Sequence, residues 1–149
     1  MAWILVLYQK DTIIMEKKML VTISDYQRLV GLIEFSAIKF RDTGGVDELL
    51  SNLMGARIVA QEKIPDKIIT MNSTVRLRQV PTGEETEITL VYPHDAKGTD
   101  KISVLSSLGA ALVGQQEGET ITWKSKGKKF TAEIVELVFQ PEAAGDYYL

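Results

Sequence analysis

Residues 102–114 constrain the fold more than any other stretch of this chain. Residues 102–104 alternate apolar and polar side chains, which is typical of a short, half-buried strand. Ser106 or Ser107 then offers a hydroxyl to a helix start, apolar residues recur at helical spacing, and Gly114 suits a helix end. A helix of roughly two turns is not stable alone in water. It must therefore pack on a sheet.

Segments with strand patterns lie on both sides of this stretch and supply that sheet. Residues 73–80 and 84–92 alternate around a Pro-Thr-Gly turn and predict a β-hairpin. Residues 119–123 and 130–140 predict two further strands after the helix. We therefore expect an α+β fold in which one short helix crosses a four- or five-stranded antiparallel sheet.

Two helices are expected before the sheet. The first follows Ser24, a good N-cap residue, and runs through residues 25–40 with apolar side chains at helical spacing. Gly44 and Gly45 interrupt the pattern, and a second helix resumes from Val46 through about residue 58. A short connection between two helices predicts an antiparallel helical hairpin.

Pro65 stops the helical pattern and marks the expected domain boundary. The predicted organisation is an uncertain N-terminal extension at residues 1–20, a short helical hairpin at residues 21–64, and a sheet domain at residues 65–149.

The apolar run at residues 1–8 lacks the charged start and the cleavage site of a signal peptide, and it is too short to span a membrane. Two interpretations stay open for it, an additional strand or an over-extended gene start with the initiator at Met15 or Met19. We favour the second.

Composition excludes several kinds of chemistry. The chain has no cysteine, so disulfides, thiolate nucleophiles and cysteine-ligated zinc are ruled out, which fits a reducing cytoplasm. His94 is the only histidine and follows a proline in an expected loop, which rules out a multi-histidine metal site. No glycine-rich phosphate loop occurs. The net charge of -3 argues against wholesale neutralisation of nucleic-acid phosphates. We therefore expect no cofactor and no metal.

Two clusters of like charge allow a functional and a structural interpretation each. Asp42, Asp47 and Glu48 lie at the expected tip of the helical hairpin, where they could share a metal ion, but acidic residues also favour a helix start, and we prefer that interpretation. The second cluster is basic, and we expect it to keep the protein soluble. The alternative is that it makes a weak contact with a polyanion. It consists of Lys124, Lys126, Lys128 and Lys129.

Several motifs, in order along the chain, closely resemble the C-terminal domain of the bacterial GreA/GreB transcript-cleavage factors. They are MNSTVRL at 71–77, TGEE at 82–85, TLVYPHDA at 89–96, ISVLS at 102–106, LGAALVG at 108–114 and QPEAAGDY at 140–147. The pieces containing YPHD and QPEAAGD look more like the subgroup called regulator of nucleoside diphosphate kinase. The resemblance implies an FK506-binding-protein-like C-terminal fold behind an N-terminal coiled-coil hairpin.

The resemblance also implies a partner and a docking segment. Gre factors grip RNA polymerase at the rim of its secondary channel, and a long coiled coil carries an acidic tip to the active-site magnesium. Docking in the family involves the strand-to-helix junction, which in this chain is Leu105, Ser106, Ser107 and Leu108. Gre factors typically have an acidic residue followed by Ser-Pro where this chain has Leu-Ser-Ser. We expect free hydroxyls and an exposed leucine there, suited to a small protein-binding edge.

The expected hairpin is too short for the cleavage role. A helix of about 16 residues reaches roughly 24 Å, and the second arm is shorter. The acidic tip of Asp42, Asp47 and Glu48 should then stop short of the polymerase active site. We therefore expect a cytoplasmic, monomeric, non-enzymatic regulator of transcription that binds RNA polymerase, with no sequence-specific nucleic-acid binding and no membrane contact.

Two alternatives from other classes stay open at this point. The first is a prolyl isomerase, because the expected C-terminal fold resembles that of FK506-binding proteins. It would require an inward-facing aromatic pocket formed by Tyr92, Trp123, Phe130 and Phe139. The second is a general adaptor that dimerises through the apolar side of the second helix, formed by Leu49, Leu50 and Leu53.

Overall fold

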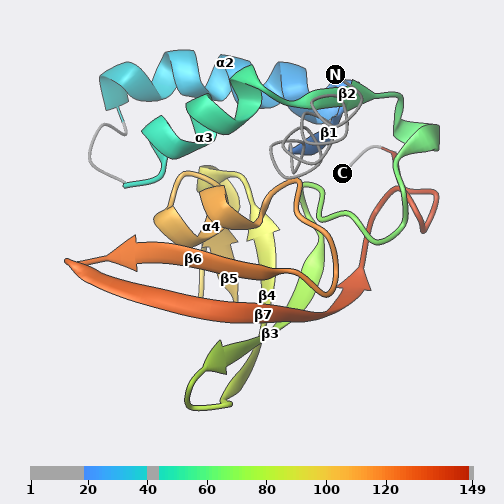
Figure 1. Cartoon of the computed structure of the whole chain (residues 1–149). Helices are drawn as coiled ribbons and strands as arrows, with labels where there is room; N and C mark the ends of the chain where they lie inside the picture. Colours follow the sequence, from blue (N-terminus) through green and yellow to red (C-terminus); the bar gives the residue numbers. More distant parts are fainter. Residues whose placement is uncertain (1–18, 40–43, 148–149) are drawn as a thin grey trace, which may run out of the picture.

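The computed structural model describes residues 19–39 and 44–147, shown as a cartoon in Figure 1. Its elements in chain order are β1 (Leu20–Thr22), α2 (Ile23–Lys39), α3 (Val46–Met54), β2 (Arg57–Val59), η1 (Gln61–Lys63), β3 (Thr74–Val80), β4 (Glu85–Val91), η2 (Pro93–Asp95), β5 (Lys101–Ser103), α4 (Ser107–Leu112), β6 (Thr120–Ser125) and β7 (Lys128–Phe139). The predicted α+β class is confirmed. No helix in these ranges is long and apolar enough to cross a membrane.

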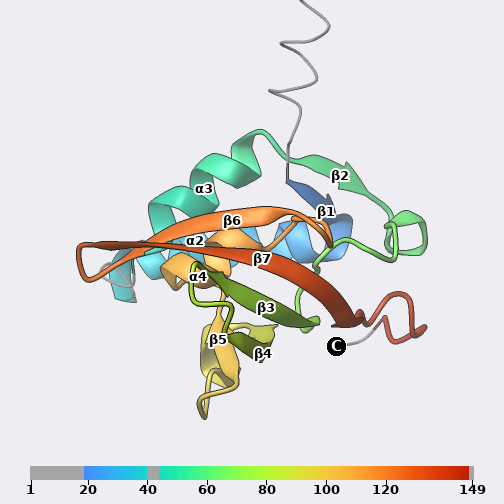
Figure 2. The same ribbon diagram turned by 60° about the horizontal axis from the view of Figure 1, so that its bottom comes forward.

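The main sheet has five strands in the order β5-β4-β3-β7-β6. Figure 2 shows β7 curving across the molecule with β6 beside it. The expectation of a wholly antiparallel sheet was wrong at one edge, because β5 pairs with β4 in parallel, with Leu90 opposite Ile102. The connection at residues 92–100 carries the chain back along β4, where Thr89 N donates to Asp100 O, so β5 starts in the same direction.

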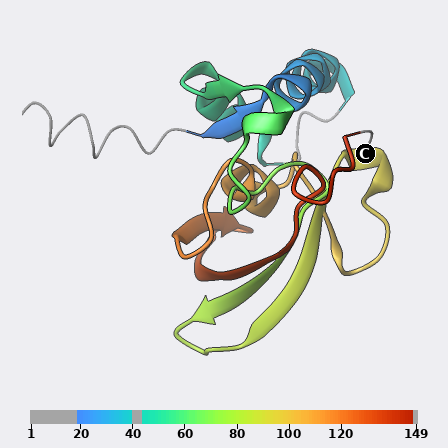
Figure 3. The same cartoon turned by 90° about the vertical axis from the view of Figure 1, so that its right-hand side faces the viewer.

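The helices lie in a layer on one side of this sheet, as Figures 1 and 3 show. α4 lies directly against β6, and α3 packs on α4 and on α2. The second helix is shorter than predicted. It ends at Met54, and the residues expected to continue it form β2, which pairs in parallel with β1. Gly55 ends the helix, and pairing Ile58 with Val21 places that stretch in a strand.

The start of α2 also differs from the prediction that Ser24 is its cap. The helix begins at Ile23, and the Thr22 hydroxyl accepts the Asp25 backbone N–H at 3.0 Å. Thr22 is therefore the N-cap, two residues earlier than expected. The Thr-x-x-Asp spacing is that of a capping box, but the Asp25 carboxylate turns elsewhere, as described below.

A single hydrophobic core joins the helical layer to the sheet. Its fully buried members come from α2, α3, α4 and the sheet, and burying each such side chain contributes roughly 1.5–3 kcal/mol. They include Leu29, Leu49, Leu90, Leu105, Leu112 and Ile134, each 0% exposed. The core thus continues across Pro65, and the division into two domains at that residue stays a prediction.

The chain after β7 is held on the rest of the protein by the buried side chain of Gln140 and by the Thr70 hydroxyl, which donates to Glu142 Oε1 at 2.6 Å. Gln140 is 4% exposed, and its Nε2 donates to Pro65 O at 2.8 Å and to Ile68 O at 2.7 Å. Its Oε1 accepts the Ala143 N–H at 3.1 Å. The QPEAAGDY motif therefore has a structural role, because it ties the C-terminal segment to the start of the sheet region.

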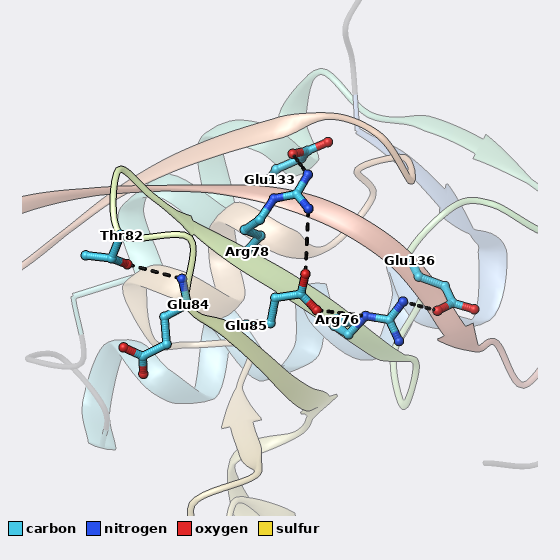
Figure 4. Close-up of polar contacts among 7 residues, drawn as sticks. All are labelled: Arg76, Arg78, Thr82, Glu84, Glu85, Glu133 and Glu136. Atoms are coloured by element: carbon cyan, nitrogen blue, oxygen red, sulfur yellow. Dashed lines mark hydrogen bonds and ion pairs between the residues drawn. The ribbon is translucent and has the colours of Figure 1, made fainter.

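Charges on the outer face of the sheet form a network across three strands, drawn in Figure 4. Arg76 contacts Glu85 at 3.4 Å and Glu136 at 2.6 Å. Arg78 contacts Glu85 at 3.6 Å and also pairs with Glu133. Both arginines point outward, as predicted, and each has a carboxylate on both neighbouring strands.

Candidate functional site

The predicted docking segment, which we call the junction segment (residues 105–108), lies between β5 and α4. Ser106 is the N-cap of α4, since its hydroxyl accepts the Gly109 N–H at 3.0 Å and donates to Ser103 O at 2.7 Å. The Ser103 hydroxyl accepts the Leu105 N–H at 3.1 Å. These bonds fix the turn from strand to helix, and they occupy the Ser106 hydroxyl that was expected to be free.

The exposure of the junction segment also differs from the expectation. Leu105 is 0% exposed and belongs to the core, so it cannot be the exposed leucine of a binding edge. Leu108 is half-buried, with one side packed on the core, and Ser107 is half-buried as well. Ser106 is half-buried too, but its hydroxyl makes two internal hydrogen bonds. Of the four predicted residues, Ser107 and Leu108 are therefore the best placed to contact a partner.

The described end of the hairpin connection, Gly44 and Gly45, contacts this segment. Gly45 N donates to Leu105 O at 2.9 Å, and Gly44 forms a β-bridge with Ser106. The approach is close, because a Cβ on Gly45 would lie 2.3 Å from Ser106 O and 2.5 Å from Leu105 O. Glycine is therefore required at position 45 by the space available. In Figure 1, α3 lies above α4, on which it packs.

The acidic tip was predicted to comprise Asp42, Asp47 and Glu48. Asp42 lies outside the described residues. Asp47 and Glu48 occupy the first turn of α3, where negative charge is favourable to the helix, and both are exposed. Local desolvation raises the pKa of Glu48 above its ordinary value. Among the described residues, no three acidic or histidine side chains gather closely enough to hold a metal ion.

A buried polar centre was missed by the sequence reasoning. Asp25 is 4% exposed, and its carboxylate accepts the Met71 N–H at 3.1 Å, which joins α2 to the chain just before β3. Burial raises the pKa of Asp25 from 3.8 to about 6, opposed by the Met71 hydrogen bond and Arg28 and reinforced by Glu142. The Thr22-x-x-Asp25 spacing was the available signal, but it predicts a local cap and gives no sign of this distant partner.

Tyr92 lies over this centre. Its ring is packed under the Arg28 guanidinium, whose Cζ is 4.3 Å from the ring centroid, a favourable cation–π distance. The hydroxyl is buried beside Asp25 and makes no hydrogen bond of normal geometry within the described residues. Burial, followed by the charge of Asp25, raises the pKa of Tyr92. Through Asp25 and Met71, this centre attaches the first turn of α2 to the chain that enters β3.

The aromatic pocket required for the prolyl isomerase alternative does not form. The Tyr92 ring lies under Arg28 near Asp25, whereas Trp123 and Phe130 stack on each other with ring centroids 5.6 Å apart. Phe139 is 37% exposed at the end of β7. His94, expected in a loop, is in η2 with its side chain 76% exposed and 3.3 Å from Asp95.

The surface required for the dimeric adaptor is not available either. Leu49 is 0% exposed and Leu53 is 3% exposed, because both are committed to the core. Leu50, at 43% exposed, is the one member of that predicted face that remains on the surface.

Comparison with known proteins agrees with this architecture. The family model described as transcription elongation factor GreA/GreB, C-terminal, matches residues 64–138. The regulator of nucleoside diphosphate kinase from Escherichia coli K12 is 44% identical over 107 residues, which cover 69% of this chain and 77% of that protein. GreA from Thermodesulfovibrio yellowstonii is 35% identical over 98 residues, 65% of this chain and 62% of that protein.

A solved structure supports the same grouping. The prokaryotic transcription elongation factor GreA/GreB from Nitrosomonas europaea aligns with a TM-score of 0.69 at 37% identity, over 82% of this chain and 100% of that one. The family match and these relatives together identify the chain. It belongs to the GreA/GreB family, and within that family it is similar to the regulators of nucleoside diphosphate kinase.

Proposed function

We propose that this protein regulates transcription by binding RNA polymerase near its secondary channel, and that it does not catalyse transcript cleavage. Membership of the GreA/GreB family supports the partner, since relatives carry the name transcription elongation factor. We expect it to act in the cytoplasm as a monomer and without a cofactor.

The proposal that the protein does not cleave transcripts rests on one contact, the hydrogen bond from Gly45 N to Leu105 O. It holds the hairpin connection against the protein's own junction segment. α3 has nine residues and therefore spans only about 14 Å. A factor that delivers carboxylates to a distant magnesium ion needs a tip that projects freely. Asp47 and Glu48 instead lie in the first turn of α3, directly after Gly45, and α3 packs on α4.

The same contacts narrow the docking surface. Leu105 and Ser106 maintain the shape of the junction segment, one as a core residue and the other as a helix cap. We propose that Ser107 and Leu108 make the direct contact with polymerase. A half-buried leucine at a rigid turn suits the apolar centre of a small interface.

The test is a pull-down of core RNA polymerase by the purified protein and its variants. Leu108→Lys and Ser107→Glu should each weaken binding by about tenfold or more, equivalent to about 1.4 kcal/mol. The matched control is Leu50→Lys, which alters an exposed leucine on the outer side of α3. A GreA-type factor should compete with the wild-type protein for polymerase.

Cleavage is measured separately, on stalled elongation complexes with labelled RNA. The expected result is no shortening beyond that of polymerase alone. Absence of binding at micromolar protein would overturn the docking proposal, and efficient shortening that depends on Asp47 and Glu48 would overturn the non-catalytic part. Equal binding by wild type and Leu108→Lys would show that the junction segment is not the docking surface, while polymerase would remain the partner.

A further inference from the structure

The turn between β6 and β7 carries concentrated positive charge, and we call residues 124–129 the lysine turn. Four of its six residues are lysines, all exposed: Lys124, Lys126, Lys128 and Lys129. Within the described part of the chain, none of them forms an ion pair. The turn forms an extremity of the molecule in Figures 1 and 2. Its charge is opposite in sign to the net charge of -3 of the whole chain.

The arrangement of these lysines opposes folding. Lys124 lies directly opposite Lys129 in the antiparallel pair, where like charges are destabilising. Lys126 has φ 52, in the left-handed region that asparagine and glycine adopt more readily. Elsewhere on this sheet, opposite charges face each other across paired strands. Arg78 lies opposite Glu85 on one side and Glu133 on the other. The lysine turn lacks the carboxylates that this sheet provides for its arginines.

The surroundings of the lysine turn favour a phosphate-bearing partner. Lysine is depleted at protein–protein interfaces, whereas its compact charge suits phosphate oxygens. The Thr122 and Thr131 hydroxyls lie on the same face as Lys124, 3.4 Å from each other. On the opposite face, half-buried Trp123 stacks on Phe130 and packs against the core beside the turn. Exposed ammonium groups that follow the sugar-phosphate backbone are the main feature of proteins that bind single-stranded nucleic acid without sequence preference.

We propose that the lysine turn binds single-stranded nucleic acid through its phosphates, without sequence preference. The site is distinct from the junction segment, so it adds a nucleic-acid contact to the proposed polymerase contact and does not depend on it. Because the lysines contact phosphates, RNA and DNA of equal length should bind alike.

The test is fluorescence anisotropy with a labelled oligouridylate. If all four lysines contact phosphates, raising salt from about 50 to 200 mM should weaken wild-type binding roughly 50-fold, from a slope of about 0.7 per contact. The test variant combines Lys124→Gln, Lys126→Asn, Lys128→Gln and Lys129→Gln. The control variant combines Lys63→Gln, Lys67→Gln, Lys97→Gln and Lys101→Gln, which changes the net charge equally.

The test variant should lose the salt-dependent binding, and the control should retain it. The test variant should also unfold at a higher temperature than wild type, because the opposed Lys124 and Lys129 charges are gone. Lys129→Gln alone should reduce the salt slope by about 0.7, which provides a reading even if the combined variant folds poorly. In a Trp3→Phe background, oligouridylate should change the fluorescence of Trp123, the remaining tryptophan.

Four outcomes would overturn the proposal. They are no saturable binding by wild type, undiminished binding by the test variant, equal loss in the control variant, and binding of polyglutamate as tight as that of oligouridylate. The last would assign the lysine turn to an acidic protein surface instead.

Discussion

The seating of the helical hairpin on the junction segment predicts a large effect for Gly45→Ala. The added Cβ would lie 2.3 Å from Ser106 O and 2.5 Å from Leu105 O, both backbone atoms, where ordinary contacts begin at 3.4 Å. The connection must therefore move away. The backbone of Gly45 itself is not strained, with φ -107, so the effect comes from the contact alone.

The magnitude follows from what this movement breaks. Losing the Gly45 N to Leu105 O hydrogen bond costs about 1 kcal/mol. Overpacking against fixed atoms costs a further 1–3 kcal/mol or so, while the stiffer unfolded chain returns about 0.5–1 kcal/mol. We expect a net loss of about 1–3.5 kcal/mol, which for a chain of this length lowers Tm by roughly 2–14 °C.

The assay is urea and thermal unfolding of three glycine variants. A Cβ added at Gly31 or at Gly55 would meet no atom of another segment within 4 Å, so alanine fits at both sites. Gly31→Ala, in the middle of α2, should stabilise the protein by about 0.5–1 kcal/mol, and Gly55→Ala should change it little. If Gly45→Ala stays within about 0.5 kcal/mol of wild type, the hairpin is not seated on the junction segment, and its tip is then free to project.

Three further substitutions test the polar contacts. Burial raises the pKa of Asp25 to about 6, so the folded state binds the Asp25 proton more tightly than the unfolded state does. The free energy of unfolding should therefore fall by up to about 3 kcal/mol as pH rises from about 4 to 6. Asp25→Asn keeps an acceptor for Met71 N and should abolish this fall in urea titrations; an unchanged pH profile would contradict it. Ser106→Ala should cost about 1 kcal/mol by thermal unfolding, and no loss would argue against its capping role. Gln140→Ala leaves Ile68 O without its side-chain donor and removes one of the two donors to Pro65 O, and it should cost about 2–3 kcal/mol; a shift under about 0.5 kcal/mol would show that Gln140 does not hold the C-terminal segment.

Local patterns predicted a large part of this fold. The β3–β4 hairpin, β6, β7 and α4 all lie within a few residues of their expected positions, because alternation, turn residues and helical spacing are properties of short segments. Ser106 was one of two serines expected to cap α4, and it does so, because a cap acts within one turn of its helix.

The candidate site was predicted only in outline. The junction segment was placed between the right strand and helix, but the burial of Leu105 could not be read from its neighbours in the sequence. A leucine after a strand is equally compatible with an exposed edge and with a core position. Which one holds depends on tertiary packing, and here the Leu105 side chain joins the core cluster.

The sequence by itself therefore determined the α+β class, most element positions and the family, since these rest on local periodicity and on motifs in order. Tertiary structure decided the parallel pairing of β4 with β5 and of β1 with β2, the buried Asp25 centre and the seating of Gly45. Asp25 and its partner Met71 are 46 residues apart in the chain. Contacts over such separations form only when the hydrophobic core brings distant segments together, so no pattern within either segment predicts them.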